Sequence, residues 1–138
     1  MKPEQLYVNK VKESGKDSKV ENTISINWAC WTGFNDFIDQ FAFVDDVAKV
    51  TLFNYKTRTT NEVEGVSSSS LNTCAIEQKF SKLLACGGLE PKIAMFTINK
   101  VTEGGKIQKF KELSGHHGII TCLAFLDDNY LISCFIYY

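Results

Sequence analysis

An internal repeat is the feature that most constrains how this 138-residue chain can fold. When the sequence is displaced by 48 positions along itself, residues 71–86 meet residues 119–134 with like residues at seven places. The pairs are Leu71 with Ile119, Thr73 with Thr121, Cys74 with Cys122, Leu83 with Leu131, Leu84 with Ile132, Ala85 with Ser133 and Cys86 with Cys134. A displacement of 43 similarly pairs residues 49–53 with residues 92–96. The chain is therefore expected to consist of similar units some 43 to 48 residues long.

Each unit has the pattern of short β-strands, because its apolar residues form brief runs rich in Val, Ile, Phe and Tyr. The expected strands are residues 23–31, 37–44, 49–55, 71–77, 83–86, 92–98, 110–113, 119–126 and 130–136. Turn-forming residues separate them at 45–46, 67–70, 87–88, 104–105 and 127–129. A four-stranded unit that repeats at this length is typical of a β-propeller blade. The predicted fold is all-β: a partial propeller of two to three blades, each a four-stranded antiparallel sheet, within residues 23–138.

The amino-terminal residues 1–22 have a different composition, rich in Lys, Glu and Ser and interrupted by Gly15. We expect them to form a flexible tail. Two or three blades do not close a ring, whereas propellers typically have four to eight. We therefore expect that the chain expressed alone would associate with other copies or depend on a partner rather than remain a stable monomer.

Charge and hydropathy exclude several classes of function. Fifteen basic and sixteen acidic residues give a net charge of -1 without a dense basic run, so nucleic-acid binding is not expected. The apolar runs are too short to span a bilayer as a helix, and the start of the chain lacks the apolar core of a signal peptide. These features favour a cytoplasmic protein without a transmembrane segment.

The cysteines and histidines give no motif for a metal, cofactor or catalytic site. Five cysteines, without a Cys-x-x-Cys motif, favour reduced thiols over a disulfide framework. Two pairs recur with the same spacing, Cys74 with Cys86 and Cys122 with Cys134, and we expect all four to be small buried apolar residues. The paired glycines at 87–88 and 104–105 lack the Lys-Ser or Lys-Thr of a phosphate-binding loop. The sequence thus predicts a protein that is not an enzyme and that binds no cofactor or metal.

A Gly-His pair, Gly115 and His116, precedes the strand expected at 119–126. This segment resembles the entry to a blade in the WD-repeat family. The resemblance implies that His116 hydrogen-bonds a hydroxyl on a later strand, for which Ser133 is the candidate, and so ties the strands of the blade together. General base catalysis would instead need a nucleophile or carboxylate partner that no motif supplies. The neighbouring His117 is expected to face solvent.

A wider resemblance, over about residues 24–134, is to the β subunit of heterotrimeric G proteins. It is carried by the segments 69–75, 85–90, 111–118 and 125–129, above all by Ala-Cys-Gly-Gly-Leu at 85–89 and Phe-Leu-Asp-Asp-Asn at 125–129. The resemblance implies a non-catalytic scaffold that binds a GTPase α subunit and a small γ subunit and transmits receptor signals. Such a protein is cytoplasmic and reaches the inner face of the plasma membrane through its partners. A WD-repeat adaptor for assemblies unrelated to GTPases is the alternative interpretation.

The resemblance also assigns a protein interface to Ser70, Asn72, Leu89 and Ile119. In the family the first, second and fourth of these positions usually carry Trp, Met or Tyr, and only Leu89 is retained here. Large aromatic and Met side chains dominate binding energies, so we expect the chain to bind an α subunit weakly. The family also holds its γ subunit through an amino-terminal coiled coil, and residues 1–22 show no heptad repeat.

Overall fold

The computed structural model describes residues 24–31, 39–80, 82–99 and 106–137, and the expected tail at 1–22 lies outside them. The described residues form ten β-strands and no helix. The strands are β1 (Ile26–Trp31), β2 (Gln40–Asp45), β3 (Val50–Asn54), β4 (Thr59–Val63), β5 (Leu71–Ile76), β6 (Leu83–Gly88), β7 (Lys92–Ile98), β8 (Ile107–Ser114), β9 (Ile119–Phe125) and β10 (Leu131–Ile136). The part of the chain that the structure describes contains no helix that could cross a membrane. The all-β prediction is therefore confirmed.

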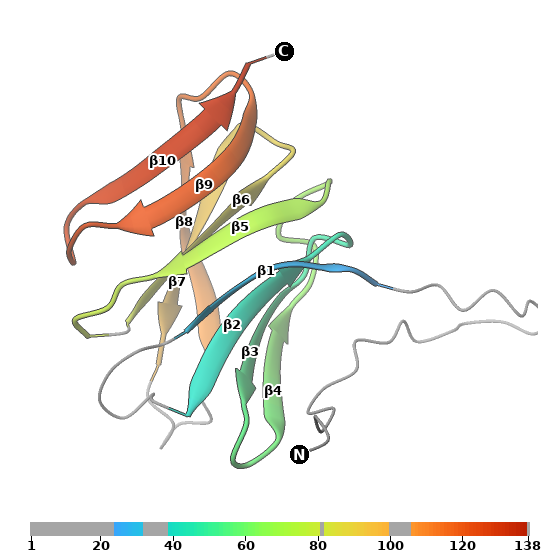
Figure 1. Ribbon diagram of the computed structural model, residues 1–138, viewed down its shortest axis with the longest axis vertical. Coiled ribbons are helices and arrows are strands. Elements are labelled where there is room, and N and C mark those ends of the chain that lie inside the picture. The colour runs from blue at the N-terminus through green and yellow to red at the C-terminus, as the bar shows by residue number, and fades with distance from the viewer. Residues whose placement is uncertain (1–23, 32–38, 81, 100–105, 138) are drawn as a thin grey trace, which may run out of the picture.

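The strands form two four-stranded sheets and one hairpin, and each strand pairs antiparallel with the next along the chain. The first sheet has the order β1-β2-β3-β4, the second β5-β6-β7-β8, and the hairpin pairs β9 with β10. Figure 1 shows the second sheet between the first sheet and the hairpin, with β1, β5 and β9 as the neighbouring inner strands. This arrangement is two propeller blades and the inner half of a third.

The apolar core lies in two layers, one on each face of the second sheet. Side chains between the first and second sheets include Val44, Leu52, Cys74, Leu84 and Phe96. The other layer joins the second sheet to the hairpin and includes Ala75, Ala85, Met95, Ile120 and Leu123. Covering on both faces explains why β5, β6 and β7 are mainly apolar without strict alternation of polar and apolar residues.

A β-bulge recurs near the start of each inner strand. The extra residue in the pairing with the next strand is Asn27 in β1, Asn72 in β5 and Thr121 in β9. Counted from the bulge, Cys74 corresponds to Leu123, a displacement of 49 residues, and across the pairing Cys86 corresponds to Ser133, a displacement of 47. The repeat found at 48 in the sequence is therefore out of register by one residue in each strand of the hairpin.

This register corrects the prediction that four cysteines are buried equivalents. Cys74 and Cys86 are each 1% exposed and face the first sheet. Cys122 and Cys134 are exposed, because a displacement of one residue turns a strand side chain to the opposite face. The face of the hairpin that packs on the second sheet carries Leu123 instead.

Two further expectations were wrong. The strand β4 (Thr59–Val63) was not predicted, because its residues Thr-Thr-Asn-Glu-Val are mostly polar, as suits the outer edge of a sheet. The pair Gly87 and Gly88 was predicted as a turn but ends β6 inside the second sheet. A β-carbon on Gly87 would lie 2.9 Å from Ile120 Cγ2, so the hairpin packs against a strand that has no side chain there.

Candidate protein-binding edge

One edge of the molecule gathers the starts of the inner strands and the turns beside them. Asn27 Nδ2 in β1 donates hydrogen bonds to Ser70 Oγ (2.9 Å) and to the Leu71 carbonyl (2.7 Å), which joins the starts of β1 and β5. The close approach of Ile120 to Gly87 brings the start of β9 to the same end of the second sheet. We call this the inner-strand edge and define it by Ile26, Val47, Ser70, Asn72, Leu89 and Ile119.

The turn that carries Leu89 is held to this edge by the backbone. The Leu89 amide donates to the Ser70 carbonyl at 3.0 Å, and the corresponding bond in the first sheet runs from the Asp46 amide to the Ser25 carbonyl at 3.1 Å. A β-carbon on Gly88 would lie 2.0 Å from the Ser70 carbonyl oxygen, so this close crossing requires glycine. The turn therefore presents the Leu89 side chain outward, 47% exposed.

The structure brings the four predicted interface residues to the inner-strand edge and differs in how far it exposes them. Ser70, Asn72 and Ile119 are half-buried, and the Ser70 hydroxyl accepts the bond from Asn27. Sequence reasoning missed the apolar Ile26 (48% exposed) and Val47 (52% exposed). Neither belongs to a recognisable motif, and only the strand and turn positions that the structure reveals place them on this edge.

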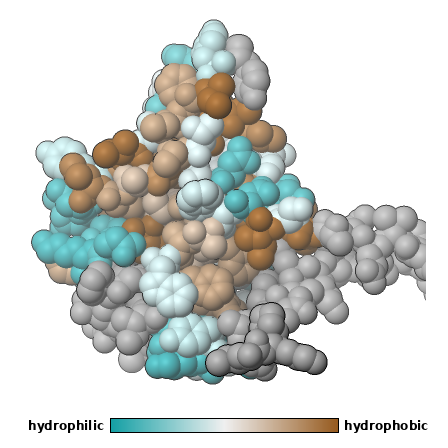
Figure 2. Space-filling model, viewed as in Figure 1, coloured by the Kyte–Doolittle hydropathy of each residue, from teal (hydrophilic) through white to brown (hydrophobic). Residues whose placement is uncertain are grey.

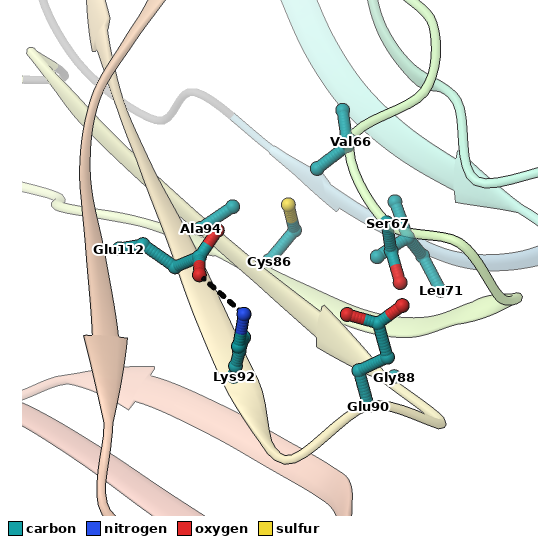
Figure 3. Close-up of a pocket in the computed structure, with 9 residues that line it drawn as sticks. All are labelled: Val66, Ser67, Leu71, Cys86, Gly88, Glu90, Lys92, Ala94 and Glu112. Carbon is teal, nitrogen blue, oxygen red and sulfur yellow. Dashed lines mark ion pairs between the residues drawn. The ribbon is translucent and has the colours of Figure 1, made fainter.

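A polar cluster on the second sheet supports the turn from below, as Figure 3 shows. Glu90 Oε1 accepts a hydrogen bond from the Ser68 amide at 2.7 Å and another from the Ser68 hydroxyl. These bonds, the hydroxyl bond foremost, lower the pKa of Glu90. Lys92 Nζ lies 3.0 Å from Glu112 Oε1 and ties β7 to β8. The first sheet repeats this ion pair between Lys49 and Glu62 at 3.4 Å.

The hollow among these residues is too small for a substrate. Its volume is about 10 Å³, enough for one water molecule, and the buried thiol of Cys86 forms part of its lining. A larger open groove of about 360 Å³ lies elsewhere, beside Glu77 and Phe80. Its buried carboxylate, Glu77, is occupied by the amides of Lys79 and Phe80. The described residues contain no group of three or more metal-ligating side chains.

The predicted blade network lies at the entry to the hairpin. His116 Nε2 lies 2.6 Å from Ser133 Oγ, which joins the segment before β9 to β10. The imidazole also contacts the ring of Phe135, with ring centroids 4.4 Å apart. His117 is exposed. The structure thus brings His116 and Ser133 together, while their contribution to stability stays a prediction.

Apolar surface extends over the hairpin, as the brown areas in Figure 2 show. The exposed apolar side chains there include Ile132 (52%), Phe135 (41%) and Ile136 (53%). They alternate with the side chains that pack on the second sheet, because successive strand residues face opposite sides.

Comparison with known proteins places these features in a family context. No protein-family model matches the chain. Over 84 residues it is 34% identical to guanine nucleotide-binding protein subunit beta-1 of Drosophila melanogaster, covering 59% of the chain and 24% of that protein. Over 77 residues it is 36% identical to the protein of the same name from Caenorhabditis briggsae, covering 54% of the chain and 22% of that protein. The chain thus spans about a quarter of the length of these relatives.

Solved structures agree on the fold. The WD40 repeats of RRP9 superpose with a TM-score of 0.65 at 17% identity, covering 80% of the chain and 32% of that structure. The structure of U3-55K superposes with a TM-score of 0.64 at 18% identity, covering 80% of the chain and 33% of that structure. At such identities the likeness shows the fold alone. The chain is a set of WD-repeat propeller blades whose sequence resembles that of G-protein β subunits.

Proposed function

We propose that the chain belongs to a non-catalytic protein-binding scaffold of the G-protein β-subunit type that takes part in heterotrimeric G-protein signal transduction. The observation that supports this proposal best is the inner-strand edge. There Leu89, Ile26 and Val47 expose apolar side chains on a backbone that is fixed by hydrogen bonds between strands and turns. Apolar anchors on a rigid frame are what a protein interface needs, since little conformational entropy is lost on binding.

The proposed partners are a GTPase α subunit across this edge and a γ subunit, with a cytoplasmic location and recruitment to the plasma membrane through those partners. This part of the proposal rests on the resemblance to the relatives named above. The small side chains of Ser70 and Asn72 remove contact area that larger anchors would supply, so the expected affinity for an α subunit is low.

A binding assay with purified full chain and GDP-loaded α subunit tests the proposal. We expect weak binding that strengthens about tenfold or more when Ser70→Trp and Asn72→Met are combined. Leu89→Glu should abolish it, because the substitution buries a charge at the interface. Phe110→Glu is the matched control: Phe110 is 53% exposed but lies on β8, the outer strand of its sheet. Equal losses from the two Glu variants would place the interface elsewhere, and a submicromolar complex with the unaltered chain would refute the expected weakness.

A WD-repeat adaptor for a complex unrelated to GTPases is the second candidate. Its supporting observation is that Ser70 makes an internal hydrogen bond with Asn27 rather than presenting a large side chain outward. If the Ser70→Trp, Asn72→Met variant binds no α subunit although it folds, the adaptor function is favoured.

A further inference from the structure

Two cysteines from adjacent sheets place their sulfur atoms in contact. Cys30 Sγ in β1 lies 3.4 Å from Cys74 Sγ in β5. The sulfurs of a disulfide are ~2.05 Å apart, so bond formation needs an approach of roughly 1.4 Å, within the reach of side-chain rotation and small strand shifts. The two residues are 44 positions apart in the sequence and lie outside the repeated cysteine pairs.

The two thiols differ in their access to solvent. Cys30 is half-buried, on the strand that forms the exposed side of the first sheet, whereas Cys74 is 1% exposed. The hydrogen bond with Cys30, together with burial, raises the pKa of Cys74 well above its ordinary value. Burial likewise raises the pKa of Cys86 to about 12. A small oxidant from solvent therefore reaches Cys30 before either of the other two core thiols.

We propose that Cys30 and Cys74 form a reversible disulfide, driven by hydrogen peroxide, that links the inner strands of the first and second sheets. In the first step the Cys30 sulfur attacks one peroxide oxygen, the O–O bond breaks, and Cys30 sulfenic acid and water form. In the second step the Cys74 sulfur attacks the Cys30 sulfur, and the S–OH bond breaks. The leaving hydroxide takes the Cys74 proton as a second water. Two thiols and one peroxide thus give one disulfide and two waters.

The bond would act on the inner-strand edge. Cys30 lies three residues beyond Asn27 in β1, and Cys74 lies four residues beyond Ser70, so the link would fix the strands just below the hydrogen bond between Asn27 and Ser70. In the reduced chain this junction depends on side-chain hydrogen bonds and apolar packing. Oxidation would add a covalent bond and limit the separation of β1 from β5.

The other cysteines supply the competing reactions. Cys86 is the directly opposed residue of Cys74 in the β5–β6 pairing, so it could capture Cys74 within the second sheet. Cys122 and Cys134 are exposed and could join separate chains. The experiment therefore uses the full chain with Cys122→Ser and Cys134→Ser, which leaves three of the five cysteines.

The test treats this variant with hydrogen peroxide, blocks free thiols with N-ethylmaleimide, and measures intact mass and cross-linked peptides. We expect a loss of about 2 Da, one blocked thiol instead of three, a single Cys30–Cys74 cross-link, and reversal by dithiothreitol. Adding Cys30→Ala should abolish the internal cross-link, whereas adding Cys86→Ala should leave it unchanged. Hydrogen exchange of the β1 amides should slow on oxidation and recover on reduction.

A comparison without further substitution guards against misfolding of the Cys30 variant. In urea, Cys74 is nearer in sequence to Cys86 than to Cys30, so loop closure favours the Cys74–Cys86 bond. The Cys30–Cys74 bond should therefore form about tenfold more slowly in the unfolded chain than in the folded one. A Cys74–Cys86 bond in the folded chain, three blocked thiols after treatment, or equal rates with and without urea would overturn the proposal.

Discussion

Replacing His116 with Ala should weaken the attachment of the hairpin, while replacing His117 should have little effect. His116 Nε2 and Ser133 Oγ are 2.6 Å apart, and both residues are half-buried. A hydrogen bond in such a setting contributes about 0.5 to 1.5 kcal/mol net. The contact between the imidazole and the Phe135 ring adds about 0.5 kcal/mol. His116→Ala is thus expected to lower the free energy of unfolding by about 1 to 2 kcal/mol.

Urea unfolding of the full chain, followed by circular dichroism, measures this loss. The midpoint should fall by roughly 0.5 to 1 M for His116→Ala, with the slope unchanged. His117→Ala should stay within about 0.5 kcal/mol of the unaltered chain, since that side chain is exposed. Repeating each titration at two protein concentrations separates unfolding from association, because only association makes the midpoint depend on concentration.

A double-mutant cycle shows whether the loss comes from the bond itself. If His116 acts through Ser133, then Ser133→Ala should cost little once His116 is already Ala, and the coupling energy should be about 0.5 to 1.5 kcal/mol. A coupling near zero would refute the reasoning, as would equal effects of His116→Ala and His117→Ala. In either case the 2.6 Å contact would not contribute measurably to stability.

Three further predictions follow from the fold. Far-ultraviolet circular dichroism should show β-structure with little helix, and a helix content of a third or more would contradict the propeller assignment. Gly87→Ala should lower the unfolding free energy by about 1 to 3 kcal/mol, because its β-carbon would lie 2.9 Å from Ile120 Cγ2, and adding Ile120→Val should recover part of the loss. The chain expressed alone should associate through its exposed apolar surface, which light scattering after size-exclusion chromatography detects; a cooperatively unfolding monomer would contradict this.

The apolar strands could be predicted from the sequence because burial on both faces leaves a strong compositional signal. β5, β6 and β7 lie between two apolar layers and consist mainly of such residues. The outer strand β4 has no such signal, since its pairing with β3 uses backbone atoms that any residue supplies. Gly87 and Gly88 misled the prediction because glycine marks both turns and close backbone approaches, and only the packing distinguishes the two.

The candidate site was predictable only where it resembled a known family. Ser70, Asn72, Leu89 and Ile119 were located by the resemblance, and the structure brings them to one edge. The contact between Cys30 and Cys74 had no signal in the sequence, because it depends on how two separate sheets stack. The register of the hairpin was also hidden: its connecting loop is shorter than that of the second sheet, which changes the displacement from 49 residues in one strand to 47 in the next.

The three units solve one structural problem with different residues. In each, the segment that enters the inner strand must be held to the strand or turn that follows. In the first, the Ser25 amide donates to Asp46 Oδ1 at 3.1 Å; in the second, the Ser68 amide donates to Glu90 Oε1 at 2.7 Å; in the third, His116 meets Ser133.

Only the third of these contacts involves the Gly-His motif, so a motif search finds one unit and misses two. The requirement they share is a polar link at a fixed place in the blade, because buried backbone groups at that crossing must be paired. Residue identity can therefore drift while the link persists. This explains how a chain about a third identical to its G-protein relatives keeps the geometry of their fold.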